Sequence, residues 1–242
     1  MYNKLMAVRN IPIVNGEFYH IFNRGNGKHE IFLDEKDYER FTKLLYLCNS
    51  TKKLNFREDI VLKDLDVWNV EREEPLVFIG AWVLMPNHFH LYITPNPRGL
   101  GNVVDNTKNN ISIFMGRLCN AYVKYFNRKY GRSGSLFEGP FKSVHVSLEN
   151  QAMHLFTYIH LNPIKLIQKD WKEVGILDKE KTLNFLDHYK WNSYQDFSGK
   201  TRNENLILNR ENFLSYFDTS EAFKKGIFEW LKIPNPWGLG EK

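Results

Sequence analysis

The chain has 242 residues, of which 43% are hydrophobic and 15% aromatic, which is typical of a globular protein and excludes a disordered chain. Thirty-three lysines and arginines against 28 aspartates and glutamates give a net charge of +5, a mild basic excess that is compatible with a polyanionic partner. Cys48 and Cys119 form no CxxC motif, so neither a disulfide framework nor a thiolate zinc site is indicated. The N-terminus lacks a signal-peptide core and the longest apolar run is too short to span a bilayer, so we expect a cytoplasmic protein.

The first predicted strand covers residues 17–23, which are mostly aromatic or β-branched. It ends at the turn signal Arg24-Gly25-Asn26-Gly27, where Arg24 suits a phosphate contact, although a solvated turn is equally consistent. A helix is predicted to follow, with Asp34 as its N-cap and Asp37 completing a capping box. Residues 50–75 are charged and mixed, and we expect them to form an insertion without chemistry of its own.

Two further strands are predicted at 76–85 and 88–94, either as a hairpin or as one long strand with a bulge at Pro86-Asn87. Side chains two residues apart on a strand point to the same face, so His88 and His90 project together. Two imidazoles on one strand make half of a divalent-metal site and need oxygen ligands from elsewhere. The alternative is a half-buried histidine pair without a metal.

A long helix is predicted from about 101 to 128, and it leads into a loop with three cations, a tyrosine and two glycines. Such a loop is typical of nucleic-acid contacts, so Arg128, Lys129 and Arg132 are candidates for binding DNA. A solvated helix face explains most of the other cations of the helix. In the extended segment 136–146, Lys142 is the cation that we expect nearest to a DNA backbone.

Another helix is predicted to begin near Ser147, its expected N-cap, and to end at Pro163. Within it His154, Tyr158 and Asn162 recur every four residues and therefore share one face. A tyrosine and an asparagine one turn apart can present a phenolic nucleophile and an amide-oxygen ligand to the same ion. The alternative is a packed tyrosine beside an asparagine that caps the helix. Beyond this helix, two more are predicted near 210–217 and 220–231.

Three runs of this sequence, taken together and in this order, are more specific than any one of them alone. They are Phe18-Tyr19-His20-Ile21-Phe22-Asn23-Arg24-Gly25, Pro86-Asn87-His88-Phe89-His90 and Tyr158-Ile159-His160-Leu161-Asn162-Pro163. These runs resemble the single-tyrosine HUH transposases, and among them the REP-associated tyrosine transposases. The sequence departs from these relatives at Phe137-Glu138, where they often carry Trp-Gln.

The order of the predicted elements indicates an α+β fold with an antiparallel sheet and helices mainly on one face. The resemblance implies the ferredoxin-like (RRM-like) HUH fold, with the histidine pair on a central strand. We therefore expect a single-tyrosine nuclease domain over residues 1–170, with the insertion at 50–75, and a C-terminal helical extension over residues 171–242. Relatives act as dimers or as monomers, so the oligomeric state stays open.

The resemblance also implies an activity, that of a transposase-like endonuclease and strand transferase acting on single-stranded or hairpin DNA. It makes Tyr158 the nucleophile that forms a 5′-phosphotyrosine link, and it makes His88, His90 and Asn162 the ligands of Mg²⁺ or Mn²⁺. His154 and His160 are candidates for proton transfer. Two alternatives are a nucleic-acid-binding module that no longer cuts and a metallohydrolase that uses water.

Overall fold

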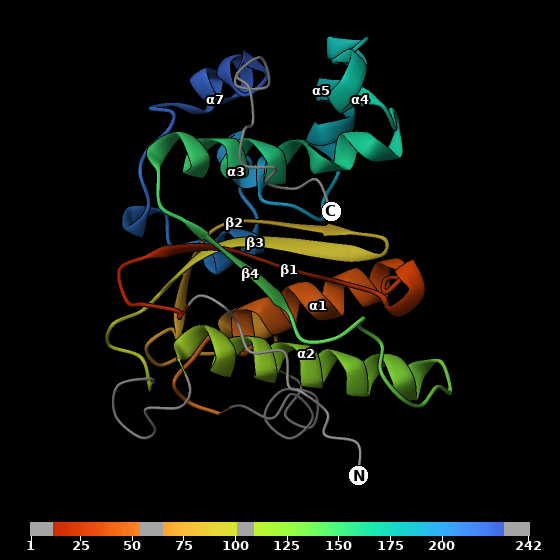
Figure 1. Cartoon of the computed structure of the whole chain (residues 1–242), viewed down its shortest axis with the longest axis vertical. Coiled ribbons are helices and arrows are strands. Elements are labelled where there is room, and N and C mark those ends of the chain that lie inside the picture. Colours follow the sequence, from red (N-terminus) through yellow and green to blue (C-terminus); the bar gives the residue numbers. More distant parts are fainter. Residues whose placement is uncertain (1–11, 54–64, 101–108, 230–242) are drawn as a thin grey trace.

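The computed structural model describes residues 12–53, 65–100 and 109–229 (Figure 1). The strands are β1 (Phe18–Arg24), β2 (Val77–Met85), β3 (His88–Pro95) and β4 (Lys142–Val146). The three long helices are α1 (Glu35–Leu47), α2 (Asn110–Lys129) and α3 (Glu149–Leu161). Shorter helices follow α3, namely α4 (Trp171–Val174), α5 (Lys179–His188), α6 (Tyr194–Phe197) and α7 (Ser220–Gly226). The 3-10 turns are η1 (Asn26–Lys28), η3 (Val67–Asn69), η5 (Asn162–Leu166), η6 (Asn203–Ile207) and η7 (Arg210–Asn212).

The four strands form one antiparallel sheet in the order β2-β3-β1-β4. A chain that runs β1-α1-β2-β3-α2-β4 with this strand order has the ferredoxin-like topology, so the predicted α+β fold is confirmed. β2 and β3 are joined at Pro86-Asn87 and pair along their length, which makes them the hairpin of the two predicted alternatives. β3 lies inside the sheet, between β1 and β2, so both of its edges are paired.

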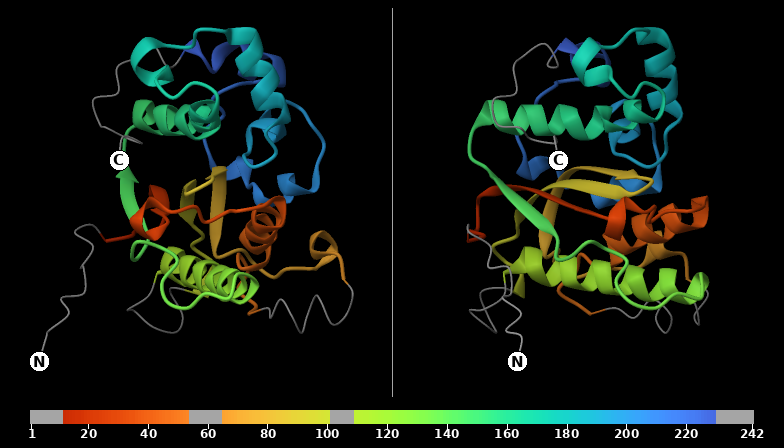
Figure 2. Two further views of the ribbon diagram at one scale, coloured as in Figure 1. Left: turned by 90° about the vertical axis from the view of Figure 1, so that its right-hand side faces the viewer. Right: turned by 45° about the vertical axis from the view of Figure 1, so that its right-hand side comes forward.

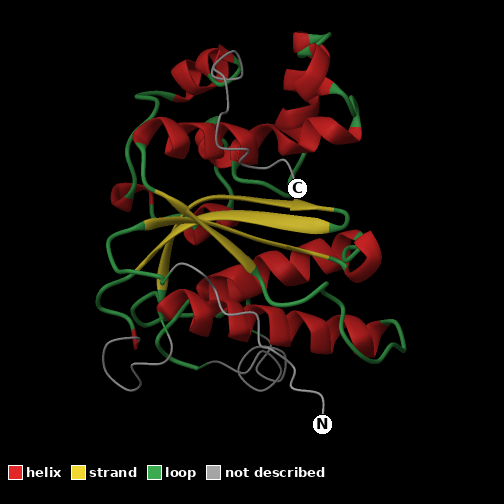
Figure 3. Ribbon diagram, viewed as in Figure 1, coloured by secondary structure: helices red, strands yellow, loops and turns green. Residues whose placement is uncertain are grey.

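The sheet separates two layers of helices (Figures 1 and 3). α1 and α2 pack together on one face, as expected for the ferredoxin-like unit, and they bury the side chains of β3 that point to that side, namely Phe89, Leu91 and Ile93. α1 begins as predicted, because the Asp34 carboxylate accepts a hydrogen bond from the Asp37 backbone N–H and the Asp37 carboxylate accepts one from that of Asp34.

The other face of the sheet is covered by α3 and the C-terminal extension, as Figure 2 shows from two further directions. A second apolar cluster fills this side and joins α3 to the extension through residues such as Leu155, Ile159, Trp171 and Phe223. β2 is buried on both of its faces, which explains why its sequence is a continuous apolar run rather than an alternating one. Among the described residues, no helix has the length and apolar character needed to cross a membrane.

The extension also covers the edge of β2 that no other strand of the described sheet pairs with. The Ser193 N–H donates to the Trp82 carbonyl at 3.0 Å, the Leu84 N–H donates to the Trp191 carbonyl at 2.8 Å, and the Ser193 hydroxyl accepts from the Trp82 N–H at 3.0 Å. An unpaired edge strand is prone to pair with other chains, and these bonds occupy its donors and acceptors. The extension is therefore hydrogen-bonded to the sheet that carries the histidine pair.

Several predicted helix limits were wrong. The helix expected from about 101 begins at Asn110, because the Asn109 side chain caps it by accepting from the Ser112 N–H at 2.8 Å, and residues 101–108 lie outside the described chain. α3 starts at Glu149 with Leu148 at the N-cap position, and the Ser147 N–H instead donates to the Gln151 side chain. For α2 the capping bond marks where the helix begins, whereas the N-cap position of α3 carries no side-chain capping bond.

The helix predicted at 210–217 is absent from the described structure, which has only the 3-10 turn η7 there. The aromatic side chains of this stretch are drawn into the second cluster instead, and the Phe213 ring lies against Gly80 of β2 so closely that a Cβ at Gly80 would come within 2.7 Å of it. The last predicted helix is shorter than expected, since α7 covers Ser220–Gly226 and the rest of that prediction partly falls outside the described residues.

Candidate active site

His88 and His90 lie at the start of β3 and point toward α3, while Phe89 between them points to the opposite face, as the strand alternation predicts. The two imidazole rings meet edge to face, with their centroids 5.0 Å apart. Asn87 in the hairpin turn holds His88, because its Oδ1 accepts from the His88 Nδ1–H at 2.6 Å. The Nε2 atom of His88 is therefore the nitrogen with the free lone pair.

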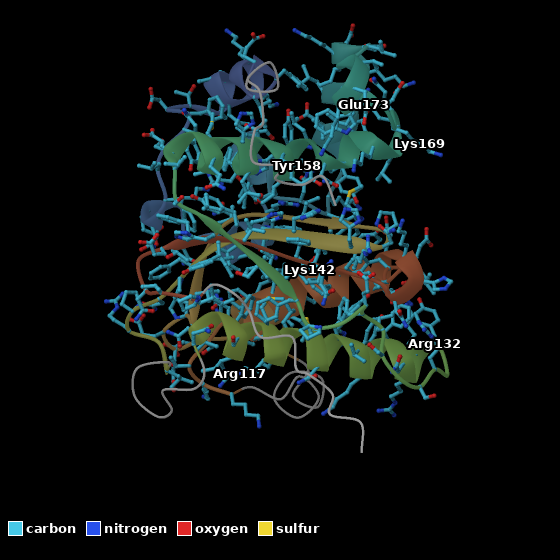
Figure 4. All side chains as sticks on the ribbon, viewed as in Figure 1. Arg117, Arg132, Lys142, Tyr158, Lys169 and Glu173 are labelled. Atoms are coloured by element: carbon cyan, nitrogen blue, oxygen red, sulfur yellow. The ribbon has the colours of Figure 1, made fainter. Side chains whose placement is uncertain are left out.

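Tyr158 lies on α3, in the helical layer above the sheet in Figure 4. Its hydroxyl oxygen is 3.5 Å from Nε2 of His90, and the two rings meet edge to face with centroids 5.2 Å apart. Only 7% of Tyr158 is exposed, so the phenol faces the site rather than bulk solvent. Residues that are 68 positions apart in the sequence thus come together, as the motif pair predicted.

Asn162 lies one turn after Tyr158, where α3 tightens into η5, and it is completely buried. Neither its Oδ1 nor its Nδ2 has a hydrogen-bond partner among the described residues. The amide is close enough to His88 and Tyr158 to affect the pKa of both, but neither contact has the geometry of a hydrogen bond. A buried amide without partners is costly, so its position calls for an interaction with a further group.

The donor set fits a divalent metal ion. Two imidazole nitrogens and one amide oxygen converge from β3 and the end of α3, and the unpartnered Asn162 amide is the group that such an ion would satisfy. No group of three His, Cys, Asp or Glu side chains in the described part of the chain is arranged to hold a metal. The set of His88, His90 and Asn162 is not a group of that kind, because its third member is an amide oxygen.

Burial sets the protonation of the site. It lowers the pKa of His88 to about 4, with the nearby Lys165 ammonium adding to the effect, and it holds the pKa of His90 well below its ordinary value. Both imidazoles are therefore neutral at neutral pH, which is the form that can bind a metal. Burial also raises the pKa of the Tyr158 phenol, so this hydroxyl is protonated until something stabilises its anion.

A pocket of about 230 Å³ opens onto His88, His90 and Tyr158. Four cationic side chains line it, and they are Arg24, Lys28, Lys142 and Lys165. A larger cavity, of about 290 Å³, lies between the sheet, α3 and the extension, and its described lining includes seven aromatic residues and no histidine. The smaller pocket is therefore the one that combines nucleophile, imidazoles and positive charge.

The predicted DNA-contacting residues fall into two groups. Arg24 and Lys142 line the pocket, and Arg24 is held by Glu138 through two hydrogen bonds of 2.6 and 2.8 Å. Arg128, Lys129 and Arg132 lie at the end of α2, in the helical layer on the other face of the sheet (Figures 1 and 4). The Lys129 ammonium is held there by the carboxylates of Asp34 and Asp37, each at 2.7 Å. The structure thus brings only Arg24 and Lys142 to the site.

The two histidines considered for proton transfer differ from the metal-facing pair. His160 donates through Nδ1 to the Phe156 carbonyl at 2.8 Å, and its Nε2 accepts from the Ser193 hydroxyl at 2.8 Å, which directs the ring toward the extension. His154 lies one turn before Tyr158 on α3, buried and outside the described lining of the pocket. Among the described residues, neither histidine belongs to the lining of the pocket that Tyr158 shares with His88 and His90.

Lys165, Lys172 and His20 lie around the site although the sequence analysis gave them no role. Lys165 lines the pocket, the Lys172 ammonium lies 4.4 Å from the centroid of the Tyr158 ring, and Nε2 of His20 is 2.8 Å from Nδ1 of His90. His20 is part of a quoted motif, but only the pairing of β1 with β3 shows that it meets His90. Lys172 belongs to α4, so the extension contributes directly to the surroundings of the tyrosine.

No family model and no curated protein matches this sequence. Among solved structures, the chain is similar to a REP-associated tyrosine transposase bound to a REP hairpin, with a TM-score of 0.46, 12% identity, and coverage of 82% of this chain and 90% of that one. It is also similar to a bacterial tRNA(His) guanylyltransferase-like protein in complex with ATP, with a TM-score of 0.36, 12% identity and 74% of each chain covered. The first protein belongs to the family that the sequence motifs resemble. Both likenesses are distant and concern the course of the chain alone.

Proposed function

We propose that this protein is a metal-dependent endonuclease and strand transferase that cuts single-stranded DNA with Tyr158 as its nucleophile. The observation that carries the proposal is the convergence of Tyr158, His88 and His90 at one cation-lined pocket, with the unpartnered Asn162 amide buried close to His88 and Tyr158. A buried phenol beside two neutral imidazoles and an unpartnered amide has a clear use in phosphodiester chemistry and little use in packing.

A nucleic-acid strand suits the charge of this pocket. The lysines and arginine that line it would contact phosphate groups, since phosphate contacts supply most of the affinity of a protein for nucleic acid. The nucleophile lies between α3 and the sheet, so the scissile phosphate must reach it on a strand that can bend into the pocket. The sequence motifs favour DNA that folds into a hairpin, and a single strand beside such a hairpin meets this requirement.

The proposed reaction is a transesterification. The Tyr158 oxygen attacks the phosphorus, the bond between phosphorus and the 3′ oxygen breaks, and a 5′-phosphotyrosine link and a 3′-hydroxyl are formed. The phenol loses one proton and the 3′ oxygen gains one, so no water is consumed. The Lys172 ammonium over the ring stabilises negative charge on the phenolate. His88, His90 and Asn162 would hold Mg²⁺ or Mn²⁺, which neutralises charge on a phosphate oxygen.

The test is a covalent adduct. Purified protein is mixed with 5′- and 3′-labelled single-stranded DNA from the flanks of its own gene, with Mn²⁺ or Mg²⁺, and separated on a denaturing gel. With the 3′ label we expect a band at the mass of the protein plus the downstream fragment, which a chelator abolishes, whereas the 5′ label should appear on a released strand that ends in a 3′-hydroxyl. Mass spectrometry should place the nucleotide on Tyr158. Retarded DNA on a native gel without any covalent band would favour a binding module, and cleavage to free 5′-phosphate ends would favour a water-using hydrolase.

Lys165 is a half-buried cation of the pocket, and its removal should weaken DNA binding. We expect Lys165→Ala to reduce affinity for single-stranded DNA by about 3- to 10-fold and to lower the slope of log affinity against log salt by about 0.7, the value for one phosphate contact. Fluorescence anisotropy over a salt series measures both. Lys169→Ala removes the same charge from an exposed position of the same region (Figure 4) and should leave the slope unchanged. Equal slopes for the two variants would exclude a phosphate contact at Lys165.

Glu138 places a negative charge beside the pocket and occupies the guanidinium of Arg24. We expect Glu138→Gln to raise the affinity for single-stranded DNA by about 2- to 5-fold at low salt, because the change removes a repulsive charge and releases Arg24 for phosphate. The gain should shrink as salt increases. Glu71→Gln, an equal charge change at an exposed site, serves as control. An equal gain in both variants would mean that net charge alone is responsible.

A further inference from the structure

His20 occupies the central part of β1 and is 1% exposed. Its Nε2 faces Nδ1 of His90 at 2.8 Å, and the two rings are stacked with centroids 5.0 Å apart. The strand register pairs His90 with Phe22, so His20 reaches His90 diagonally across the β1–β3 ladder. Two imidazole nitrogens at this distance share one proton, and one of them must donate while the other accepts.

The arrangement of His88 indicates whether His20 or His90 donates the shared proton. Asn87 Nδ2 donates to the Lys28 carbonyl at 3.2 Å, which fixes the amide so that its Oδ1 faces His88 and accepts the Nδ1–H. His88 is thus held with a protonated Nδ1 and a free Nε2. His90 has the same orientation, because its Nδ1 faces a neighbouring side chain and its Nε2 faces the Tyr158 hydroxyl.

We propose that His20 is a positioning residue that accepts the His90 Nδ1–H and thereby keeps the Nε2 lone pair of His90 aimed at the metal position. This role rests on the metal site proposed above. A metal-binding imidazole needs its second nitrogen tied to an acceptor, since that bond fixes both the tautomer and the ring orientation. Asn87 supplies the acceptor for one ligand, and His20 supplies it for the other.

Packing is the other explanation for a buried histidine here, because His20 also stacks on Phe22 with ring centroids 4.7 Å apart. Substitutions of His20 distinguish a packing role from a positioning role. His20→Phe keeps an aromatic ring in the stack and removes the acceptor, whereas His20→Gln keeps an acceptor oxygen and removes the ring. A purely structural residue should therefore tolerate Phe better than Gln, and a positioning residue should show the reverse for metal binding.

The first measurement is Mn²⁺ affinity of the full chain, from electron paramagnetic resonance of free Mn²⁺. We expect His20→Phe to weaken binding by about 10- to 100-fold, and His20→Gln to stay within about threefold of the parent protein. If the Phe variant does not fold, His20→Met replaces it, since it also lacks a comparable acceptor. Parent binding with an unchanged Phe or Met variant would overturn the role of His20 alone. No binding by the parent would overturn the proposed metal site itself.

The second measurement needs no metal. Nitrogen-15 spectra of the histidine rings in the metal-free protein distinguish a protonated from an unprotonated ring nitrogen. We expect His90 to carry its proton on Nδ1 in the parent and in His20→Gln, and to show mixed tautomers in His20→Phe. A parent spectrum with the His90 proton on Nε2 would overturn the proposal, because that ring could not present a lone pair toward Tyr158 and Asn162.

Discussion

Tyr158→Phe should abolish the covalent DNA adduct, lowering its yield by at least about 1000-fold, while DNA affinity stays within about twofold of the parent. The substitution removes only the attacking oxygen, and Tyr158 is the one tyrosine among the described residues that line the pocket. The lost hydroxyl makes only a long hydrogen-bond contact among the described residues, 3.5 Å from Nε2 of His90, so the free energy of unfolding should change by less than about 1 kcal/mol. A denaturing gel, a native gel and a thermal melt measure the three quantities.

Tyr194→Phe is the matched control for this change. Tyr194 is also buried, and its hydroxyl has no hydrogen-bond partner within the described part of the chain, so the variant loses the same atom at little cost. Its adduct yield should equal that of the parent. Cleavage that persists in Tyr158→Phe would exclude Tyr158 as the nucleophile and favour attack by water. An adduct lost equally in both variants would indicate a general defect rather than a missing nucleophile.

Asn162→Leu should stabilise the metal-free protein and at the same time destroy its metal binding. Leucine has nearly the shape of asparagine and removes a buried amide without partners, so we expect the free energy of unfolding to rise by about 1 kcal/mol and the melting temperature by about 2–4 °C. Loss of an outer-shell partner weakens metal binding by about 10- to 100-fold, and loss of a ligand should cost at least as much. Urea titration and Mn²⁺ binding test the two effects separately.

Asn192→Leu provides the opposite case. Asn192 is as completely buried as Asn162, but its Nδ2 donates to the His160 carbonyl at 3.2 Å and its Oδ1 accepts from the Tyr194 N–H at 3.0 Å. Leucine here leaves both backbone groups unpaired, so we expect a loss of about 2–4 kcal/mol of stability and unchanged Mn²⁺ affinity of the folded protein. If both variants lose stability alike, the Asn162 amide has a structural partner and its assignment as a metal ligand fails.

The placement of the cations shows where charge patterns in the sequence mislead. The loop after α2 is the densest cluster of positive charge, yet it lies in the helical layer away from α3, and the Lys129 ammonium is neutralised by Asp34 and Asp37. Lys165 and Lys172 stand apart in a less basic stretch, but the packing of α3 and α4 places them at the pocket and over the tyrosine. The density of positive charge along a sequence does not predict on which face of the sheet the charged residues will lie.

The sequence by itself determined what depends on local periodicity. Strand alternation places His88 and His90 on one face, helical spacing places Tyr158 and Asn162 one turn apart, and the order of the elements indicates the antiparallel sheet. The N-cap at Asp34 was predicted correctly, and the one at Ser147 was wrong, because Leu148 occupies the N-cap position and the Ser147 N–H donates to the Gln151 side chain. Apart from the order of the elements, these properties involve residues within about one turn of each other.

Only the tertiary structure decided how these elements meet. Tyr158 lies 3.5 Å from His90, and His20 contacts His90, although these residues belong to segments that are far apart in the sequence. The packing of distant segments also leaves the Asn162 amide without a hydrogen-bond partner among the described residues. Such contacts depend on the register of β1 against β3 and on the way α3 crosses the sheet, which the packing of many side chains sets together. Periodicity determines to which side of its own helix or strand a side chain points. Packing determines which residues that side chain then contacts.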